Sequence, residues 1–267
     1  MDYQVNYINP EIKLSCYHGK LFKTEAAFEE HLLVWLISGE TKIIQADEQF
    51  VFGAGSTFLI PRNQLATIFN YPKDGLPHQA VAMHLSALRL RQFYNHKEIK
   101  PKAVKSKIIG FAKHPLLKSC LTSLIPYFEL QENFPEKIAS LKINEAINIL
   151  RTIDENIDST LSNFDEPGKI DLMAFMEKNF MFNMSLKKFG YLTGRSLTTF
   201  KRDFGRAFNT TPQRWLTQKR LELAHYHFVE NKKRPVEVCY EVGFENLSHF
   251  SRAFKKHFGY TPTSLFN

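Results

Sequence analysis

Short apolar runs alternate with turn residues over the first third of the chain. Six runs of four to eight residues are rich in β-branched and aromatic side chains, and Gly, Pro, Asn or Asp separate them. The runs occupy 31–38, 41–46, 49–52, 56–61, 65–70 and 79–85. Short strands at roughly ten-residue spacing are typical of a small antiparallel β-barrel or jelly roll. We therefore expect strands from about residue 3 to residue 86.

Beyond residue 86 the apolar positions recur every three or four residues, which predicts helices. Helices are expected at 86–96, 105–114 and 115–130, and a longer one at 136–157. The apolar face of the long helix is unusually wide and comprises Ile138, Leu141, Ile143, Ala146, Ile147, Ile149, Leu150, Ile153 and Ile157. Such a face predicts burial on two sides, against the barrel and against a second subunit. Burial inside one subunit alone is the alternative.

The last hundred residues repeat one pattern of phenylalanines. Those at 200, 204 and 208 recur at 250, 254 and 258, and each trio is followed by Thr-Pro. A fixed offset of 50 residues indicates a duplicated structural unit. Each copy, at about 185–208 and about 235–258, reads as a short helix, a glycine turn and a second helix, which is the helix-turn-helix arrangement. A helix at 214–231 connects the copies and would hold them at a fixed separation.

The second helix of each copy has an apolar side and a polar side. Leu197, Phe200, Phe204, Ala207 and Phe208 are expected inward in the first copy, and Ser196 and Asn246 are suitable N-caps. The opposite sides carry basic and hydroxyl groups, which suit DNA edges and phosphates. The candidate DNA-binding residues are Ser196, Thr198, Thr199, Lys201, Arg202, Arg206, Asn246, Ser248, His249, Ser251, Arg252 and Lys255.

We expect different roles for different candidates. Arg202, Lys201 and Arg252 can donate to guanine edges or to phosphate, and the hydroxyl groups reach bases or backbone at shorter range. Lys219, Arg220 and Lys256 are expected to contact phosphate or to be plain surface charge. Solvated helix surface is the alternative for any single residue, but it does not account for two matched outer faces.

Charge supports this division of the chain. The 267 residues carry a net charge of +8. Residues 168–267 hold 17 Lys/Arg and 8 Asp/Glu, a balance of +9, whereas residues 1–167 hold 18 and 19, a balance of −1. A basic module beside a neutral one is typical of nucleic-acid-binding proteins, although a solvated basic surface gives the same count.

Other features of the sequence argue against a metalloenzyme and against a secreted protein. The three cysteines are widely spaced and predict reduced thiols, with neither a disulfide framework nor a zinc site. His31, His78 and His84 are scattered in the expected barrel, which contains no His-x-His pair, so we expect no metal, cofactor or catalytic residue. The start of the chain lacks the apolar core of a signal peptide, and no apolar run approaches 18 residues. A cytoplasmic protein without a membrane span is expected.

The duplicated part resembles the DNA-binding domain of the AraC/XylS family of bacterial transcription regulators. The resemblance covers SLKKFGYLTGRSLTTFKRDFGRAFNTTPQRWL (185–216), RLELAHYHF (220–228) and PVEVCYEVGFENLSHFSRAFKKHFGYTPTSLF (235–266). Gly190 and Cys239 stand where alanine is usual, and small size suits both to helix packing. The resemblance implies an activator that binds promoter DNA, contacts RNA polymerase and forms a homodimer.

The first half resembles the cupin-type regulatory domain of the same family. His-Pro-Leu-Leu at 114–117, Leu-Lys-Ile-Asn-Glu at 141–145 and LTTFK at 197–201 are similar to the type III secretion activators, a subgroup controlled by a partner protein. A small-molecule effector is the alternative. A polar-lined cavity of ligand size would favour the small molecule, and a filled barrel would favour the protein.

The sequence therefore predicts two domains. A cupin-like antiparallel β-barrel with a helical dimerisation segment occupies 1–160 (barrel about 1–86, helices about 87–160). A linker spans 161–168, and an all-α double helix-turn-helix spans 169–267. The expected function is sequence-specific regulation of transcription. The alternatives are a non-specific architectural nucleic-acid binder and a cupin-type enzyme with a basic accessory module.

Overall fold

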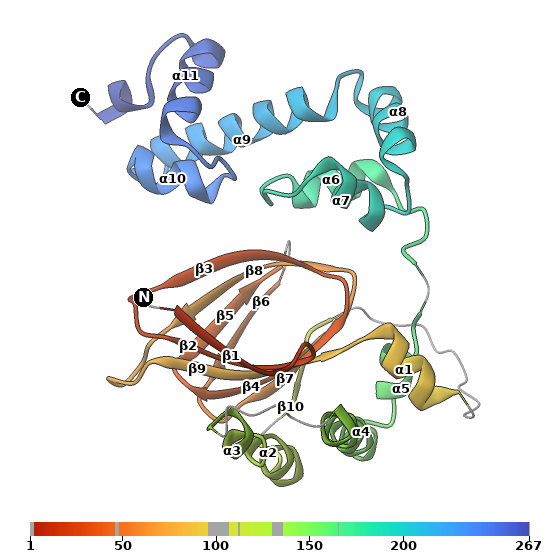
Figure 1. The fold of residues 1–267 in the computed structure, drawn as a ribbon. Coiled ribbons are helices and arrows are strands. Elements are labelled where there is room, and N and C mark those ends of the chain that lie inside the picture. The colour runs from red at the N-terminus through yellow and green to blue at the C-terminus, as the bar shows by residue number, and fades with distance from the viewer. Residues whose placement is uncertain are drawn as a thin grey trace. The chain divides into compact units, whose positions relative to one another are not determined.

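The chain folds into two compact units, Met1–Asp165 and Glu166–Asn267 (Figure 1). The computed structural model describes residues 3–45, 48–95, 107–111, 113–129, 136–164 and 166–266. Over these residues the first unit combines strands with helices, whereas the second is helical. This is the predicted fold class, an antiparallel β region followed by an all-α helix-turn-helix region.

Two antiparallel sheets form the first unit and face each other (Figure 1). The six-stranded sheet, in spatial order, contains β1 (Tyr3–Asn9), β2 (Ile12–Tyr17), β9 (His78–Leu85), β4 (His31–Ser38), β7 (Thr57–Ile60) and β10 (Ile109–Phe111). The four-stranded sheet contains β3 (Phe22–Phe28), β8 (Gln64–Tyr71), β5 (Glu40–Ile44) and β6 (Gln49–Gly53).

The central strand β4 is buried on both faces. Leu32, Val34 and Leu36 belong to the core between the two sheets, whereas Leu33 and Trp35 belong to a second core beneath the helices. Successive side chains of a strand point to opposite faces of the sheet. When both faces are covered, apolar residues are favoured at every position, and the usual alternation of apolar and polar residues is lost. This explains the unbroken apolar run that marks β4 in the sequence.

Helices cover the outer face of the six-stranded sheet. They are α1 (Ala87–Tyr94), α2 (Pro115–Thr122), α3 (Ile125–Glu129), α4 (Glu136–Ile153) and α5 (Ile157–Leu161). Leu90, Leu117 and Ile147 from these helices share one core with Leu33 and Met83 of the sheet. The helical segment is therefore packed onto the sheet through a continuous apolar core.

The helix expected at 105–114 is wrong for Ile109–Phe111, which form strand β10. Ile109 pairs with Leu59 and Phe111 with Thr57 of β7. Ile108 enters the core between the sheets, whereas Phe111 enters the core beneath the helices. Burial on alternate faces requires the two-residue period of a strand, which a short apolar run does not reveal by itself. Residues 105, 106 and 112 lie outside the described residues.

The apolar face of α4 is narrower than the sequence predicts. Ile143, Ala146, Ile147 and Leu150 are buried, but Leu141 is 65% exposed. Leu141 lies two residues from Ile143, and positions two apart on a helix point about 200° apart, so the two cannot share one buried side. Leu141 therefore remains an exposed apolar side chain on the outer surface of the first unit.

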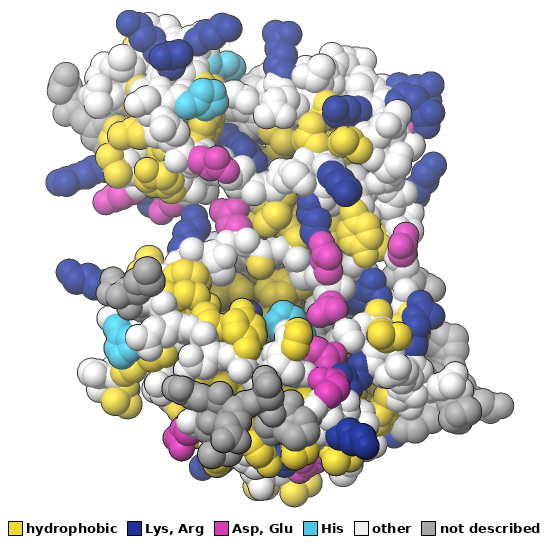
Figure 2. Space-filling model, in the orientation of Figure 1, with side chains coloured by type: hydrophobic (Ala, Val, Ile, Leu, Met, Phe, Trp, Pro, Cys, Tyr) yellow, Lys and Arg dark blue, Asp and Glu magenta, His cyan; other side chains and the backbone are white. Residues whose placement is uncertain are grey.

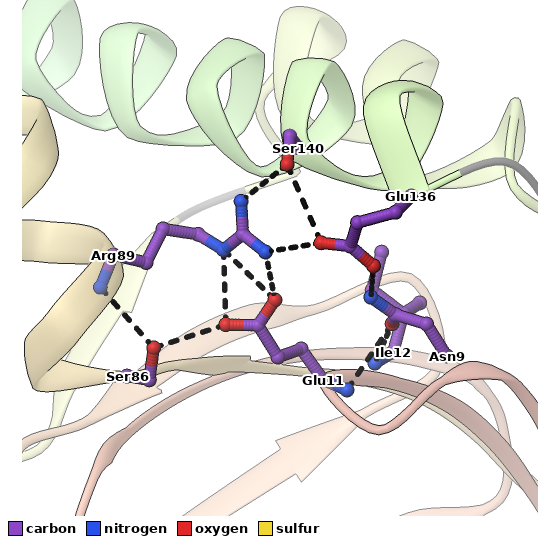
Figure 3. A network of polar contacts seen from close by, with 7 residues as sticks. All are labelled: Asn9, Glu11, Ile12, Ser86, Arg89, Glu136 and Ser140. Atoms are coloured by element: carbon purple, nitrogen blue, oxygen red, sulfur yellow. Dashed lines mark hydrogen bonds and ion pairs between the residues drawn. The ribbon is translucent and has the colours of Figure 1, made fainter.

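A polar network centred on Arg89 fixes α1 and α4 to the sheet (Figure 3). Arg89 Nε donates to both carboxylate oxygens of Glu11, in the turn between β1 and β2, at 2.9 and 2.8 Å. Its terminal nitrogens donate to Glu136 Oε1 at 2.8 Å and to Ser140 Oγ at 2.6 Å, both on α4. The hydrogen bond from Arg89 holds the pKa of Glu136 below its usual value. One guanidinium therefore connects three segments that are far apart in the sequence.

The second unit is a set of helices in which two helix pairs flank one long helix. The pairs are α7 with α8 and α10 with α11, and α9 lies between them in the sequence. The elements are α6 (Leu172–Asn179), α7 (Leu186–Leu192), α8 (Leu197–Phe208), α9 (Pro212–Val229), α10 (Pro235–Glu241), α11 (Leu247–Phe258) and a terminal 3₁₀ turn (Pro262–Phe266).

Candidate nucleic-acid interface

In each helix pair a turn joins the two helices, and the two turns are closely similar. Gly194 and Gly243 have positive φ angles of 66° and 85°, a conformation that glycine adopts without strain. The residue after each glycine donates its backbone N–H to the preceding helix: Arg195 to the Gly190 carbonyl at 2.8 Å, and Phe244 to the Cys239 carbonyl at 3.0 Å. The duplication seen in the sequence is therefore a duplication of backbone geometry.

Small side chains allow the helices of each pair to cross closely. A Cβ on Gly190 would lie 3.0 Å from the Arg195 carbonyl oxygen and 3.4 Å from Phe200 Cβ. The matching Cys239 is fully buried, and burial raises the pKa of its thiol. The packing role that the sequence predicts for this position is confirmed.

Helices α8 and α11 begin and end in the same way. Ser196 and Asn246 are the N-caps, and their side-chain oxygens accept the backbone N–H of Thr199 (3.2 Å) and of His249 (3.0 Å). The C-caps Asn209 and Gly259 are both left-handed, with φ of 51° and 85°. Each helix therefore presents 12 residues between matched ends.

One side of each helix is the core of its pair. Phe200 and Phe204 of α8 and Phe250 and Phe254 of α11 are fully buried, as predicted. Leu197 was also expected inward, but it lies in the first turn of α8 and is 37% exposed. The buried stripe of α8 begins at Phe200 instead.

The predicted DNA-binding side chains lie mainly on the opposite, solvent-facing side. Two of the twelve, Thr199 and Ser251, are only half-exposed. The exposed members are Ser196, Thr198, Lys201, Arg202, Arg206, Asn246, Ser248, His249, Arg252 and Lys255. Lys and Arg side chains project from the surface of the second unit (Figure 2). Each helix thus offers a convex polar side with hydrogen-bond donors of different lengths.

Arg202 keeps most of its hydrogen-bonding capacity for a ligand. Its side chain is 59% exposed, and its contact with Asp203 is long, 3.4 Å from either Nε or a terminal nitrogen. Asp203 also accepts a bond from Arg195 Nε at 3.2 Å. Because Arg195 already partners this carboxylate, Arg202 can leave it without stranding a buried charge.

Arg220 is not the surface or phosphate-binding cation that the sequence suggests. Its guanidinium donates to the backbone carbonyls of Phe180, Phe182 and Gly243 at 3.0, 2.8 and 3.0 Å. The neighbouring Lys219 is also partly exposed, but its partner is a side chain, Glu177, in an ion pair at 2.8 Å. Sequence spacing could not separate the two residues, because only the fold brings carbonyl groups to Arg220.

Comparison with known proteins matches both units to one kind of regulator. The model of a helix-turn-helix domain matches residues 192–267, and that of the ExsA N-terminal regulatory domain matches residues 31–160. The chain belongs to the AraC/XylS family. Its second unit carries the AraC-type DNA-binding domain, and its first unit carries a regulatory domain of the ExsA type.

Named relatives in this family are transcription regulators. The chain is 26% identical over 234 residues to the transcriptional regulator ExsA of Pseudomonas aeruginosa, covering 85% of this chain and 83% of ExsA. It is 28% identical over 163 residues to the virulence regulon activator VirF of Yersinia enterocolitica, and this match covers 60% of each chain. Among solved structures, apo ToxT of Vibrio cholerae aligns over 97% of this chain and 98% of ToxT, with 13% identity and a TM-score of 0.46.

The regulatory domain of this AraC-type protein contains a cavity of about 560 Å³ between its sheets. Apolar side chains from both sheets, including Phe28, Val34 and Phe58, form much of its wall. This volume lies within the usual range for small-molecule sites, about 300–1,000 Å³. The size meets one part of the criterion for a small-molecule effector, but that criterion also requires a polar lining, and most of this wall is apolar.

A neutral polar cluster lies in the wall of the same cavity. The Thr41 hydroxyl donates to Asn70 Oδ1 at 3.0 Å, so its oxygen is left to accept from His78 Nε2 at 2.8 Å. Burial lowers the pKa of His78 to about 4, so its imidazole is neutral at pH 7. The cluster itself offers hydrogen bonds and no charge, whereas Lys13, Glu29 and Glu30 bring charged groups to other parts of the wall.

Neither a metal site nor a membrane span is seen over the described ranges. They contain no group of three or more His, Cys, Asp or Glu side chains placed to hold a metal ion. One His-x-His pair, His225 and His227, does occur, but it lies on α9, where His225 bonds the Tyr260 hydroxyl at 2.8 Å and His227 bonds Asn231 at 2.9 Å. No described helix combines the length and the apolar character needed to cross a bilayer.

Proposed function

We propose that the protein is a sequence-specific transcription activator that reads promoter DNA with α8 and α11. The observation that carries the proposal is the matched pair of recognition helices, each with a phenylalanine core on one side and exposed basic and hydroxyl groups on the other. The two helix pairs, called heads below, have closely similar geometry and different outward side chains. They therefore suit two adjacent DNA sites of different sequence. The DNA-binding domain is proposed to span 169–267, after a regulatory domain at 1–160 and a linker at 161–168.

The dimensions of the second unit fit B-DNA. The major groove is about 12 Å wide and admits one α-helix, and it returns to the same face of the duplex about every 34 Å. The connecting helix α9 has 18 residues, which gives it a length of about 27 Å. With a recognition helix beyond each end, one protomer can span two successive major grooves on one face.

The outward residues have separate roles in this proposal. Arg202 and Arg252 hold two parallel N–H groups that match O6 and N7 of guanine, and they occupy equivalent positions of α8 and α11. Lys201, Arg206 and Lys255 contact phosphates, which position the module without reading sequence. Thr198, Ser248 and His249 lie in the first turns, where shorter side chains reach base edges or backbone.

DNA binding is expected to fall steeply with salt. If these three cations neutralise phosphates, the logarithm of affinity falls with slope about −2.7 against the logarithm of salt concentration, a loss of about 40-fold between about 50 and 200 mM. Lys255→Gln should reduce the slope by about one. The control Lys137→Gln removes an exposed cation from α4 of the regulatory unit and should leave the slope unchanged.

The same titrations separate the proposal from its alternatives. They use the full chain with a duplex selected from random-sequence DNA and with an unselected duplex. Equal affinity for the two duplexes would replace the proposal with a non-specific architectural binder. Stoichiometric metal in the purified protein would instead support a cupin-type enzyme.

Other parts of the proposal rest on the family. The protein is proposed to act in the cytoplasm, to contact RNA polymerase and to form a homodimer. The 65% exposed Leu141 of α4 and the 50% exposed Leu116 of α2 support a subunit contact on this side of the regulatory unit. A double Leu→Gln variant that remains a dimer in analytical ultracentrifugation would contradict this placement.

The regulatory domain is proposed to bind a small, mainly apolar effector in the cavity between its sheets. Ala82 lies in the cavity wall, so Ala82→Phe fills part of the space. The wild-type protein should enhance the fluorescence of 1-anilinonaphthalene-8-sulfonate, an anionic dye with apolar aromatic rings, and Ala82→Phe should reduce this about tenfold by steric exclusion. Leu88→Phe enlarges a 70% exposed apolar side chain on α1, outside the cavity wall, and serves as the control. Equal dye binding by all three proteins would show that the dye does not occupy the cavity.

A further inference from the structure

One side chain of α9 bonds both the segment that precedes the first helix pair and the turn inside the second pair. Arg220 Nε and a terminal nitrogen donate to the carbonyls of Phe180 (3.0 Å) and Phe182 (2.8 Å), in the segment that leads from α6 into α7. The other terminal nitrogen donates to the carbonyl of Gly243 (3.0 Å), in the turn between α10 and α11. The planar guanidinium directs its donors along fixed directions, so these three bonds constrain orientation as well as distance.

Two more contacts join the same segments. Asn183 Nδ2, just before α7, donates to Glu245 Oε1, in the turn before α11, at 2.7 Å. A Cβ on Gly243 would lie 2.7 Å from the carbonyl oxygen of Met181, so the two backbone segments approach closely. The segment before α7 and the turn between α10 and α11 therefore form a small interface around Arg220.

This interface solves a problem that α9 alone leaves open. The chain leaves α8 and enters α9 through residues 209–211, and leaves α9 for α10 through residues 230–234. Each helix pair packs on α9 through aromatic side chains, Trp215 against Phe204 at one end and Phe228 against Phe254 at the other, and apolar contacts of this kind are not directional. Hydrogen bonds from one guanidinium to both sides add the direction that apolar packing lacks.

We infer that Arg220 sets the relative orientation of α8 and α11, and with it the spacing of the two DNA sites that one protomer reads. Arg220 is a positioning residue: its donors are directed to backbone carbonyls inside the protein, and it acts on DNA through the two helices. The Asn183–Glu245 hydrogen bond supports the same arrangement. This inference rests on the proposed DNA-binding function and adds the contact that holds the two recognition helices in one fixed arrangement.

The test compares spacing preference in the wild-type protein and in Arg220→Lys. The probes are a duplex selected from random-sequence DNA with the wild-type full chain, and two versions with one base pair inserted or deleted between its two protected regions. Wild type should bind the altered duplexes at least tenfold more weakly than the selected one. Arg220→Lys keeps the charge but lacks the planar fork, so it should bind the selected duplex about tenfold more weakly and distinguish the three duplexes by less than about threefold.

The control is Arg214→Gln, which removes an exposed charge from the first turn of α9 but leaves the interface intact. It should lower affinity for all three duplexes to the same extent and keep the wild-type preference. If Arg220→Lys shows no cooperative thermal unfolding, Asn183→Asp decides, because it places a carboxylate against Glu245 and should relax the preference in the same direction. A full wild-type preference in the folded variant would overturn the inference. If wild type selects no duplex at all, the proposed function fails instead.

Discussion

Replacing Arg202 or Arg252 with alanine is expected to weaken binding to the selected duplex by about 1–3 kcal/mol each, and by about 2–6 kcal/mol together. Each guanidinium can donate two parallel hydrogen bonds to one guanine, and alanine can donate none. Arg202 is well exposed and only loosely held by Asp203, so little protein structure is lost with its side chain. The two residues lie on different recognition helices and are expected to contact different bases, so their effects should add.

The measurement is a gel-shift titration of the four proteins with the selected and the unselected duplex. The ratio of the two affinities should fall with each arginine, because base contacts supply discrimination. Lys187→Ala is the matched control, since Lys187 is an exposed cation on α7, outside the recognition helix. It should leave the ratio unchanged. Arginine variants with an unchanged ratio would show that the reading face is assigned wrongly.

Phe204→Ala and Phe254→Ala should each lower the free energy of unfolding of the second unit by about 3–5 kcal/mol. Both side chains are fully buried at equivalent positions of α8 and α11. Phe204 packs with its ring centroid 4.3 Å from Phe208 and 5.6 Å from Trp215. Phe254 lies 4.6 Å from Phe258 in the same way. Truncation leaves a cavity in each helix pair, so the two losses should be similar.

Urea unfolding of the full chain, followed by circular dichroism, measures these losses. Leu197→Ala is the control, because Leu197 has an apolar side chain on the same helix but is 37% exposed, and it should cost less than about 1 kcal/mol. An effect of Phe204→Ala no larger than this would contradict the core assigned to α8. A large effect in one head alone would contradict the structural equivalence of the two copies.

The features that could be predicted from the sequence are those with a local cause. Phenylalanines every four residues must share one side of a helix, so the buried stripes of α8 and α11 follow from spacing alone. Ser196 and Asn246 cap because their oxygens reach back to the next turn, and Gly194 and Gly243 take a positive φ with little strain. Each of these inferences needs only a few neighbouring residues.

The features that were missed depend on contacts between distant segments. Arg220 follows Lys219 directly, and nothing local shows that the carbonyls of Phe180 and Gly243 converge on one of them and not on the other. Strand β10 is too short to show its period, and it is defined by pairing with β7. Leu141 looked buried because apolar residues occur nearly all around α4, and only packing decides which of them face solvent.

The cavity in the regulatory unit is another feature that depends on contacts between distant segments. Its wall alternates between residues of two sheets, so no single run of sequence describes it. The polar cluster of Thr41, Asn70 and His78 joins three strands through side-chain hydrogen bonds. From the sequence we could say which kind of effector a cavity would favour. Whether the cavity exists depends on how closely the two sheets approach each other.

Methylation interference on the selected duplex tests the two-headed reader most directly, because it reports contacts at guanine N7 in the major groove. For the wild-type full chain we predict two clusters of interfering guanines on one face of the duplex, about 10 base pairs apart. Arg202→Ala should remove interference in one cluster and Arg252→Ala in the other. A single cluster, or two clusters that respond together to either substitution, would contradict the account.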